Sequence, residues 1–199
     1  TILTNGGGAT IKGVDVDVTL APIQNLTITP NMSYAHGRYD AFDEGPTFFP
    51  LPPNAPRAIP SGCAFTAYPT GGAGIPMAQR NCDLAGNKTV NTPPFAFTLA
   101  ALYTLPTAVG EFDFSASWAH GGNYYSEPDN ISFTKQPHTD LVNASIRWTS
   151  ANERLDVRLW PRNLLKDKYY SYVANSATSG TKYSPAEPRV YGVTVGAHF

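Results

Sequence analysis

The stretch Val14-Asp15-Val16-Asp17-Val18-Thr19-Leu20 decides the fold, because apolar and polar residues alternate along it with a period of two. A β-strand points successive side chains to opposite faces of its sheet. The valines and Leu20 therefore form an apolar face, and the aspartates and Thr19 form a polar one. No long segment of the chain repeats its apolar residues with the 3.6-residue period of a helix. We predict an all-β protein.

The same alternation recurs in six further segments, which we also predict to be strands. Apolar side chains fill one face of each segment, and Ser, Thr, Asn, Asp and Arg account for much of the other. The six segments are 26–34, 95–105, 112–118, 142–148, 155–159 and 191–199. Strands of ~9–11 residues cross a lipid bilayer at a tilt, and we expect these strands to approach that length. Pro30 removes one backbone donor, so it marks a bulge or a shift of register.

Short and long connections alternate between these strands. The links 21–25, 106–110 and 150–153 are tight turns. The links 41–92, 123–137 and 161–188 are long. Loops this long are uncommon in compact soluble domains, but outer-membrane barrels combine short periplasmic turns with long extracellular loops. The pattern predicts an antiparallel, up-and-down transmembrane β-barrel segment with its long loops outside the cell.

Aromatic residues sort by depth on the apolar face, as they do at the two interfaces of a bilayer. Near the predicted extracellular ends of the strands lie Tyr34, Phe95, Phe97, Trp118 and Tyr191. Near the periplasmic ends lie Tyr103, Phe112, Trp148 and Phe199. The residues between these two girdles are mostly aliphatic.

The other face of the predicted strands is too polar to fill a dry core. It carries Asp15, Asn31 and Asp113, and further along the chain Arg147, Asp156 and Arg158. We therefore expect a water-filled or plugged lumen. A ladder of ion pairs among the last three residues explains them better than a relay that passes substrate.

The composition excludes several classes of function. Charged residues make up 15% of the 199 residues, the formal net charge is −1, and no basic field for nucleic acid results. The chain has no nucleophile elbow, phosphate loop or HExxH motif, so we predict no enzyme activity, no catalytic residue and no cofactor. The four histidines, His36, His120, His138 and His198, lack the spacing of metal ligands, although folding could bring two of them together.

The two cysteines, Cys63 and Cys82, have 18 residues between them in a stretch rich in glycine and proline. This spacing fits neither a zinc knuckle nor a redox CxxC pair. A disulfide formed in an oxidising compartment is the favoured interpretation, and closing such a loop contributes about 3 kcal/mol. Two free thiols are the alternative.

Four segments together resemble a known family. They are Gly13-Val14-Asp15-Val16-Asp17-Val18, Asn25-Leu26-Thr27-Ile28, the run LWPRNLLKDKYY at 159–170, and the end of the chain from Pro188 to Phe199. They resemble the GVE-type strand, the strand after a short turn, the RNL-x-DK-x-Y motif and the terminal aromatic strand of TonB-dependent outer-membrane receptors. Leu165 and Lys166 depart from the family pattern, because they insert one residue.

The resemblance implies that residues 1–199 form the C-terminal part of a 22-stranded barrel, about a third of it. The N-terminal plug and the energy-coupling box are absent from this sequence. The implied location is the bacterial outer membrane, in contact with its lipid. The implied activity is active uptake of a scarce nutrient, driven by the TonB energy-coupling protein through the missing N-terminal part.

Ferric siderophores are the default ligand that the resemblance implies, while oligosaccharides and corrinoids use the same architecture. The long loops are rich in rings and cations, which suit an anionic, partly apolar chelate or stacking on a sugar. The candidate ligand-binding residues are Tyr39, Phe48, Phe49, Arg57, Tyr68, Arg80, Tyr124, Tyr125 and Tyr172. For most rings of this kind, packing of loop on loop is the simpler interpretation.

Two other functions remain open at this point. One is a self-contained binding module, a small β-barrel or sandwich in which the Val14 strand pairs with the Phe199 strand. The other is a small pore assembled from several chains. Both alternatives share the strand chemistry described above.

Overall fold

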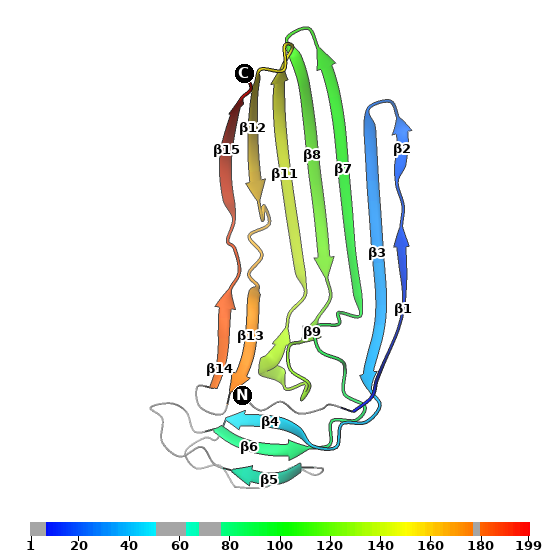
Figure 1. The fold of residues 1–199 in the computed structure, drawn as a ribbon, viewed down its shortest axis with the longest axis vertical. Coiled ribbons are helices and arrows are strands. Elements are labelled where there is room, and N and C mark those ends of the chain that lie inside the picture. Colours follow the sequence, from blue (N-terminus) through cyan, green and yellow to red (C-terminus); the bar gives the residue numbers. More distant parts are fainter. Residues whose placement is uncertain (1–6, 51–62, 68–76, 177–179) are drawn as a thin grey trace.

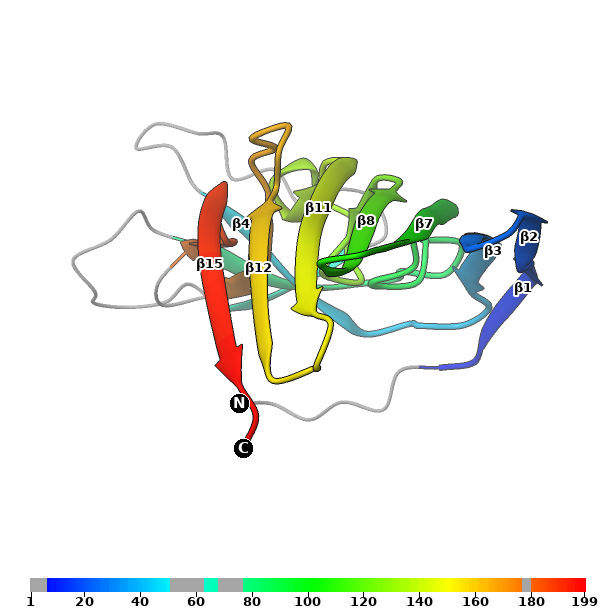
Figure 2. The ribbon, with the colours of Figure 1, turned by 90° about the horizontal axis from the view of Figure 1, so that it is seen from above.

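The structure is a computed structural model that describes residues 7–50, 63–67, 77–176 and 180–199. Eight strands form one antiparallel sheet in a single curved layer (Figures 1 and 2). Seven of them follow in the order β1-β3-β7-β8-β11-β12-β15, and β2 pairs with the end of β3. Their bounds are β1 Ala9–Asp17, β2 Leu20–Ile23, β3 Leu26–Tyr39, β7 Phe95–Thr107, β8 Gly110–Gly121, β11 Thr139–Ser150, β12 Leu155–Arg162 and β15 Val190–Ala197.

Three smaller sheets lie at the end of the large sheet opposite its short turns, which we call the loop end (Figure 1). The alternation predicts no strands here, because segments this short carry too few residues to show a period. The first sheet is β4 Gly45–Pro50, β5 Cys63–Ala67 and β6 Met77–Cys82. The other two are β9 Tyr124–Tyr125 with β10 Lys135–Gln136, and β13 Tyr170–Ser176 with β14 Gly180–Pro185. The 3-10 helix η1 spans Ser132–Thr134.

The first predicted strand is interrupted in the structure between Asp17 and Leu20. Pro30 of β3 faces Val18 across the sheet, and its carbonyl accepts the Val18 N–H at 3.2 Å. The proline nitrogen has no hydrogen to donate in return, so one ladder hydrogen bond is lost. The register is the same on both sides of the interruption, so the proline inserts no bulge there.

The strand register confirms the two predicted faces, since residues directly opposite each other in a sheet share a face. Near the middle of the strands, Ala101 lies opposite Ala116, and Ala116 lies opposite Ala144. One residue to either side of Ala116, Ser117 lies opposite Asn143 and Ser115 lies opposite Ser145. Nearer the short turns, Asp113 lies opposite Arg147. The sheet therefore has one apolar face and one polar face along its whole width.

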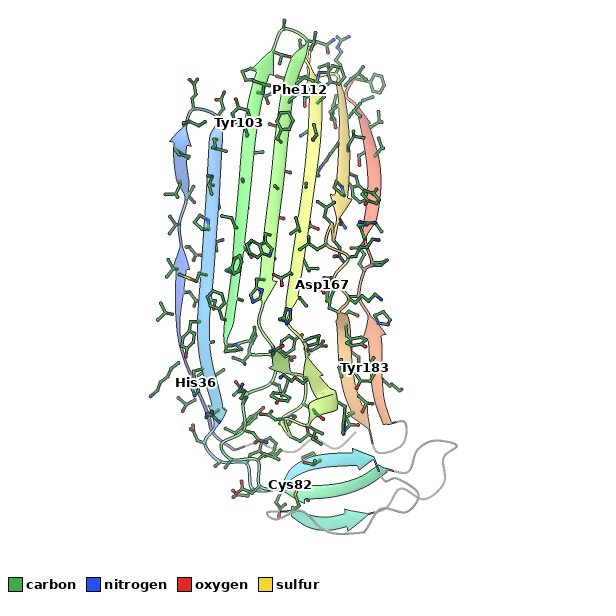
Figure 3. All side chains as sticks on the ribbon, turned by 180° about the vertical axis from the view of Figure 1, so that it is seen from behind. His36, Cys82, Tyr103, Phe112, Asp167 and Tyr183 are labelled. Atoms are coloured by element: carbon green, nitrogen blue, oxygen red, sulfur yellow. A yellow bond between two sulfur atoms is a disulfide. The ribbon has the colours of Figure 1, made fainter. Side chains whose placement is uncertain are left out.

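Aromatic rings gather near both ends of the apolar face. Phe97 and Trp118 meet edge to face at 4.6 Å near the loop end. Tyr103 and Phe114 stack at 6.4 Å near the short turns, where Figure 3 labels Tyr103 and Phe112. The predicted girdles are thus two separate bands.

The large sheet buries very little of its apolar face within this chain. Val14, Leu159, Val193 and Val195 are 52–69% exposed. Among the described residues, β1 pairs only with β3, and β15 pairs only with β12 in the large sheet. The sheet is therefore open, without the closure that a self-contained barrel requires. No helix in the described ranges is long and apolar enough to span a membrane.

Gly192 provides a test of the packing on the polar face. The indole of Trp160 lies against Gly192 on the neighbouring strand, where a β-carbon would collide with the ring. We predict that Gly192→Val displaces Trp160 and lowers the free energy of unfolding by about 1–3 kcal/mol. Thermal unfolding in detergent micelles, followed by circular dichroism, measures the loss. Ala197→Val, at an exposed position of the same strand, is the matched control, and an equal loss in both variants would contradict the prediction.

Candidate functional site at the loop end and the polar wall

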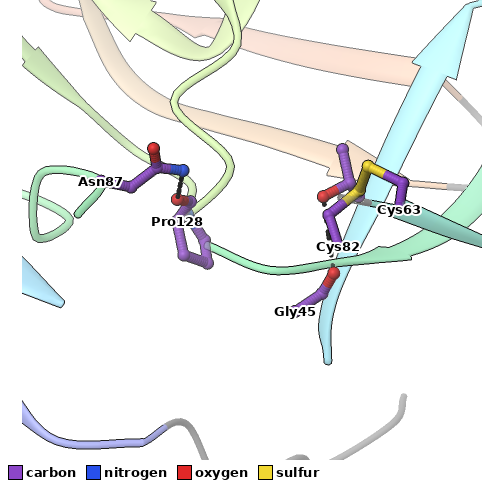
Figure 4. Close-up of a disulfide and its surroundings, with 6 residues drawn as sticks. Gly45, Cys63, Cys82, Asn87 and Pro128 are labelled. Atoms are coloured by element: carbon purple, nitrogen blue, oxygen red, sulfur yellow. Dashed lines mark hydrogen bonds between the residues drawn. A yellow bond between two sulfur atoms is a disulfide. The ribbon is translucent and has the colours of Figure 1, made fainter. Parts of the chain in front are cut away.

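A disulfide-linked sheet stands at the loop end. Cys63 of β5 and Cys82 of β6 lie directly opposite each other and form a disulfide with an S–S distance of 2.05 Å (Figure 4). Phe42 and Leu84 pack with Cys82 into a small buried core, against which the ring of Tyr39 also lies. The core and the covalent bond together hold this sheet in one arrangement.

The return segment after β6 attaches this sheet to the end of β3. The Leu84 N–H donates to the Phe42 carbonyl at 2.9 Å, and the Gly86 N–H donates to the Tyr39 carbonyl at 2.8 Å. The Thr89 N–H then donates to the Gly37 carbonyl at 3.2 Å. These hydrogen bonds hold the segment that follows β6 against the end of β3.

A second loop, 123–137, is bonded to the first. Asn130 bridges to Lys88 in both directions: its Oδ1 accepts the Lys88 N–H at 2.7 Å, and its Nδ2 donates to the Lys88 carbonyl at 3.0 Å. Asn130 adopts a positive φ of 53°, which asparagine tolerates better than most residues. The Asn87 amide donates to the Pro128 carbonyl at 3.0 Å (Figure 4). These bonds join the two loops side by side.

The β13–β14 hairpin packs against the same loop. The Tyr183 hydroxyl donates to the Phe133 carbonyl at 2.7 Å, and the Tyr183 ring lies 4.9 Å from that of Tyr170 (Figure 3). Glu127 accepts the Asn175 N–H at 3.3 Å. Burial raises the pKa of Glu127 and that of the Tyr183 hydroxyl. The three long connections therefore form one connected layer, which we call the loop layer.

Between the loop layer and the short turns, the polar face carries cavities and charged side chains. A cavity of about 640 Å³ opens between β3 and β15 and is lined by Arg158, Arg162, Trp160 and Asn143. The predicted ladder of ion pairs is only partly present. Arg147 lies 3.5 Å from Asp156, but Arg158 has no carboxylate partner within the described part of the chain.

The histidines do not form a metal centre in the described ranges. The rings of His120 and His138 stack with their centroids 6.3 Å apart. The Nδ1 atom of His120 lies 2.9 Å from the Asp140 carboxylate, which also accepts a hydrogen bond from the Trp118 indole N–H. No group of three or more His, Cys, Asp or Glu side chains in the described ranges is arranged to hold a metal ion. This cluster lies on the apolar face, where it belongs to the aromatic band near the loop end.

Comparison with known proteins assigns the family. The family model "TonB dependent receptor-like, beta-barrel" matches residues 1–164. The chain belongs to the TonB-dependent receptor β-barrel family. A search of curated protein sequences found no match.

Solved receptors share this β-barrel fold at low sequence identity. The ferric yersiniabactin uptake receptor FyuA from Yersinia pestis is 14% identical, with a TM-score of 0.70 over 98% of this chain and 24% of FyuA. BauA, the ferric preacinetobactin receptor from Acinetobacter baumannii, is 14% identical, with a TM-score of 0.60 over 94% of this chain and 22% of BauA. The siderophore receptor PiuA from the same organism is 17% identical, with a TM-score of 0.62 over 94% of this chain and 21% of PiuA. The chain thus spans about a quarter of the length of these receptors.

The segment of this TonB-dependent receptor barrel that resembles the RNL-x-DK-x-Y motif forms a turn. Asn163 is buried with a positive φ of 51°, and its side chain bonds both the N–H and the carbonyl of Asp167, at 2.8 and 2.9 Å. The Asp167 carboxylate then accepts the N–H of Asp140 at the start of β11. The motif therefore ends β12 and fixes the base of the loop layer, which is a structural role.

The predicted ligand-binding residues that the structure describes lie at the loop end. Tyr39 is partly buried and packs against the small core, with its ring edge to face with that of Phe42. Tyr124 and Tyr125 are half-buried in β9, whereas Tyr172 is 59% exposed. Phe48 and Phe49 lie on β4, Arg80 lies on β6 opposite Thr47, and Arg57 and Tyr68 lie outside the described residues.

The residues that line the central cavity were missed as ligand-binding candidates. Arg158, Trp160 and Arg162 fall on the polar side of one strand, so the alternation could have identified them. Only the fold shows that hydroxyl and amide groups of four other strands surround them.

The half-buried position of Glu127 predicts that the stability of the loop layer depends on pH. The pKa of Glu127 is raised in the folded state, so the folded layer binds more protons than the unfolded chain between the ordinary value of 4.5 and the raised value. The stability of the layer therefore falls as pH rises through this window, and Glu127→Gln removes that dependence. The measurement is the protection of the Asn175 amide against hydrogen exchange, relative to the intrinsic exchange rate at each pH, compared at pH 5 and pH 7. The exposed Glu44→Gln is the control, and an unchanged pH dependence in Glu127→Gln would contradict the assignment.

Proposed function

We propose that this chain is part of a bacterial outer-membrane receptor that takes up ferric siderophores by TonB-dependent transport. Family membership supports the receptor class. FyuA and BauA are named as receptors for ferric yersiniabactin and ferric preacinetobactin, and PiuA is named as a siderophore receptor, which favours this cargo over oligosaccharides. The scheme makes and breaks no covalent bond, so it requires no catalytic residue.

One observation carries the proposal: an open sheet with one apolar and one polar face ends in a connected loop layer. Both edge strands of an open sheet leave backbone groups unpaired, which lipid does not satisfy. We infer that β1 and β15 pair with further strands to close a larger barrel, of which this sheet is about a third if the barrel has 22 strands. The apolar face then contacts lipid, and the polar face lines the lumen.

In this arrangement the loop layer faces the outside of the cell and captures the ligand. Among the predicted ligand-binding rings whose exposure the structure describes, Tyr172 is the exposed one, and Tyr124 and Tyr125 belong to the same layer. Rings of this kind stack on the planar parts of a siderophore or sugar. The TonB protein then drives movement through the lumen, using the part of the receptor that the family places N-terminal to the barrel.

Two adjacent alanines test which face contacts lipid. Ala101 lies on the apolar face near the middle of β7, and Ala100 lies on the polar face at the same depth. We predict that Ala101→Arg costs about 2–4 kcal/mol, because the charge enters the hydrocarbon, whereas Ala100→Arg is close to neutral. Folding of the full-length receptor into lipid vesicles, followed by its heat-modifiable gel mobility, measures both. Equal costs would overturn the assignment of the faces.

The cargo is tested by uptake into cells that express the full-length receptor and lack their own siderophore receptors. We expect accumulation of radioactive iron from at least one of three loaded probes, a catecholate, a phenolate and a hydroxamate siderophore. The uptake should fall about tenfold or more when TonB is deleted. Accumulation of a labelled maltodextrin instead of iron would overturn the siderophore cargo while keeping the receptor class.

A further inference from the structure

Three cavities with different charges lie on the polar face of the described sheet. The central cavity, of about 640 Å³, contains Arg158 and Arg162 and no Asp or Glu. A cavity beside β1 is lined by Asp15 and Asp17. A third, near the short turns, is lined by three acidic residues as well as Arg147 and His198. The net charge of the chain is −1, so the cationic centre is a local feature and not a result of overall composition.

Arg158 is the arginine of this wall without a carboxylate partner among the residues described. Arg147 pairs with Asp156 at 3.5 Å, and Arg162 pairs with Glu187 at 3.6 Å. Arg158 instead lies directly opposite Arg147 in the sheet. Like charges in that position destabilise a sheet, so packing of this chain alone does not account for Arg158.

The surroundings of Arg158 provide hydrogen-bonding groups and a second guanidinium, that of Arg162, which shares its charge with Glu187. The Trp160 indole donates to the Thr194 hydroxyl at 3.0 Å, and the Arg162 guanidinium lies over the Trp160 ring at 5.1 Å. Ser117 and Asn143 lie opposite each other and line the same cavity. Guanidinium, hydroxyl and amide groups together suit an oxyanion, which accepts hydrogen bonds from all of them.

We propose that the central cavity is an anion-binding subsite on the lumen wall, in which Arg158, with Arg162 beside it, holds a carboxylate or similar oxyanion of a small molecule crossing the barrel. This inference rests on the proposed function, because it takes the polar face as the lumen wall. The subsite lies on the strands between the loop layer and the short turns. An anionic ligand released from the loops therefore meets a second site before it leaves the barrel.

The test uses thiol chemistry in the full-length receptor, with no free cysteine other than the one introduced. Ser117→Cys places a thiol in the central cavity, and Ser33→Cys places one in the cavity beside Asp15 and Asp17. The probes are an anionic and a cationic methanethiosulfonate reagent. We expect the ratio of anionic to cationic modification rates to be about tenfold higher at Ser117→Cys than at Ser33→Cys.

The arginine itself is then varied. Adding Arg158→Gln to Ser117→Cys should lower this ratio about threefold to fivefold, and Arg158→Lys, which keeps the charge, should restore most of it. Citrate at millimolar concentration should slow anionic modification of Ser117→Cys with Arg158 present and have no effect with Arg158→Gln. Heat-modifiable mobility confirms that each variant is folded.

Three outcomes would overturn the subsite: equal ratios at the two positions, no effect of Arg158→Gln on the ratio, or no modification of Ser117→Cys by either reagent. The last result would mean that polypeptide covers the cavity. Iron uptake is measured separately, so failure of the subsite and failure of the proposed cargo are distinguishable.

Discussion

The structure depends on one constraint, the strict alternation of apolar and polar side chains along paired antiparallel strands. Because partners across the sheet share a face, one register keeps Ala101, Ala116 and Ala144 together and puts Asp113 beside Arg147 on the other side. A slip of one residue in any strand would move apolar side chains to the polar face. The apolar face, the polar face and the two aromatic bands all follow from this register.

The loop layer is held by a different kind of interaction. It buries few apolar side chains: among the described residues, the core at the loop end is Phe42, Cys82 and Leu84, with Val173 buried separately. Its order comes from the disulfide, from hydrogen bonds between loops, such as those of Asn130 with Lys88, and from hydrogen bonds within one loop, such as those of Asn163 with Asp167. Asparagine serves here because its side chain both donates and accepts, and because it tolerates a positive φ.

The charges of the polar face are arranged by strand position rather than by pairing alone. Sequence proximity suggested that Asp156 would neutralise both Arg147 and Arg158, but it pairs with Arg147 and also lies 3.1 Å from His198. Arg158 lines a separate cavity with no acidic residue. This separation of charge gives the polar face chemically distinct regions.

The sequence by itself determined the strands, the two faces and the alternation of short turns with long connections, because these depend on local period and on turn residues. Segments such as 159–170 also indicated the family by their resemblance to its motifs. Only the tertiary structure decided that the long connections contain three small sheets, that Tyr39 packs against a core, and that Arg158 lacks a carboxylate partner among the described residues. These features depend on contacts between residues far apart in the chain, which no local pattern records.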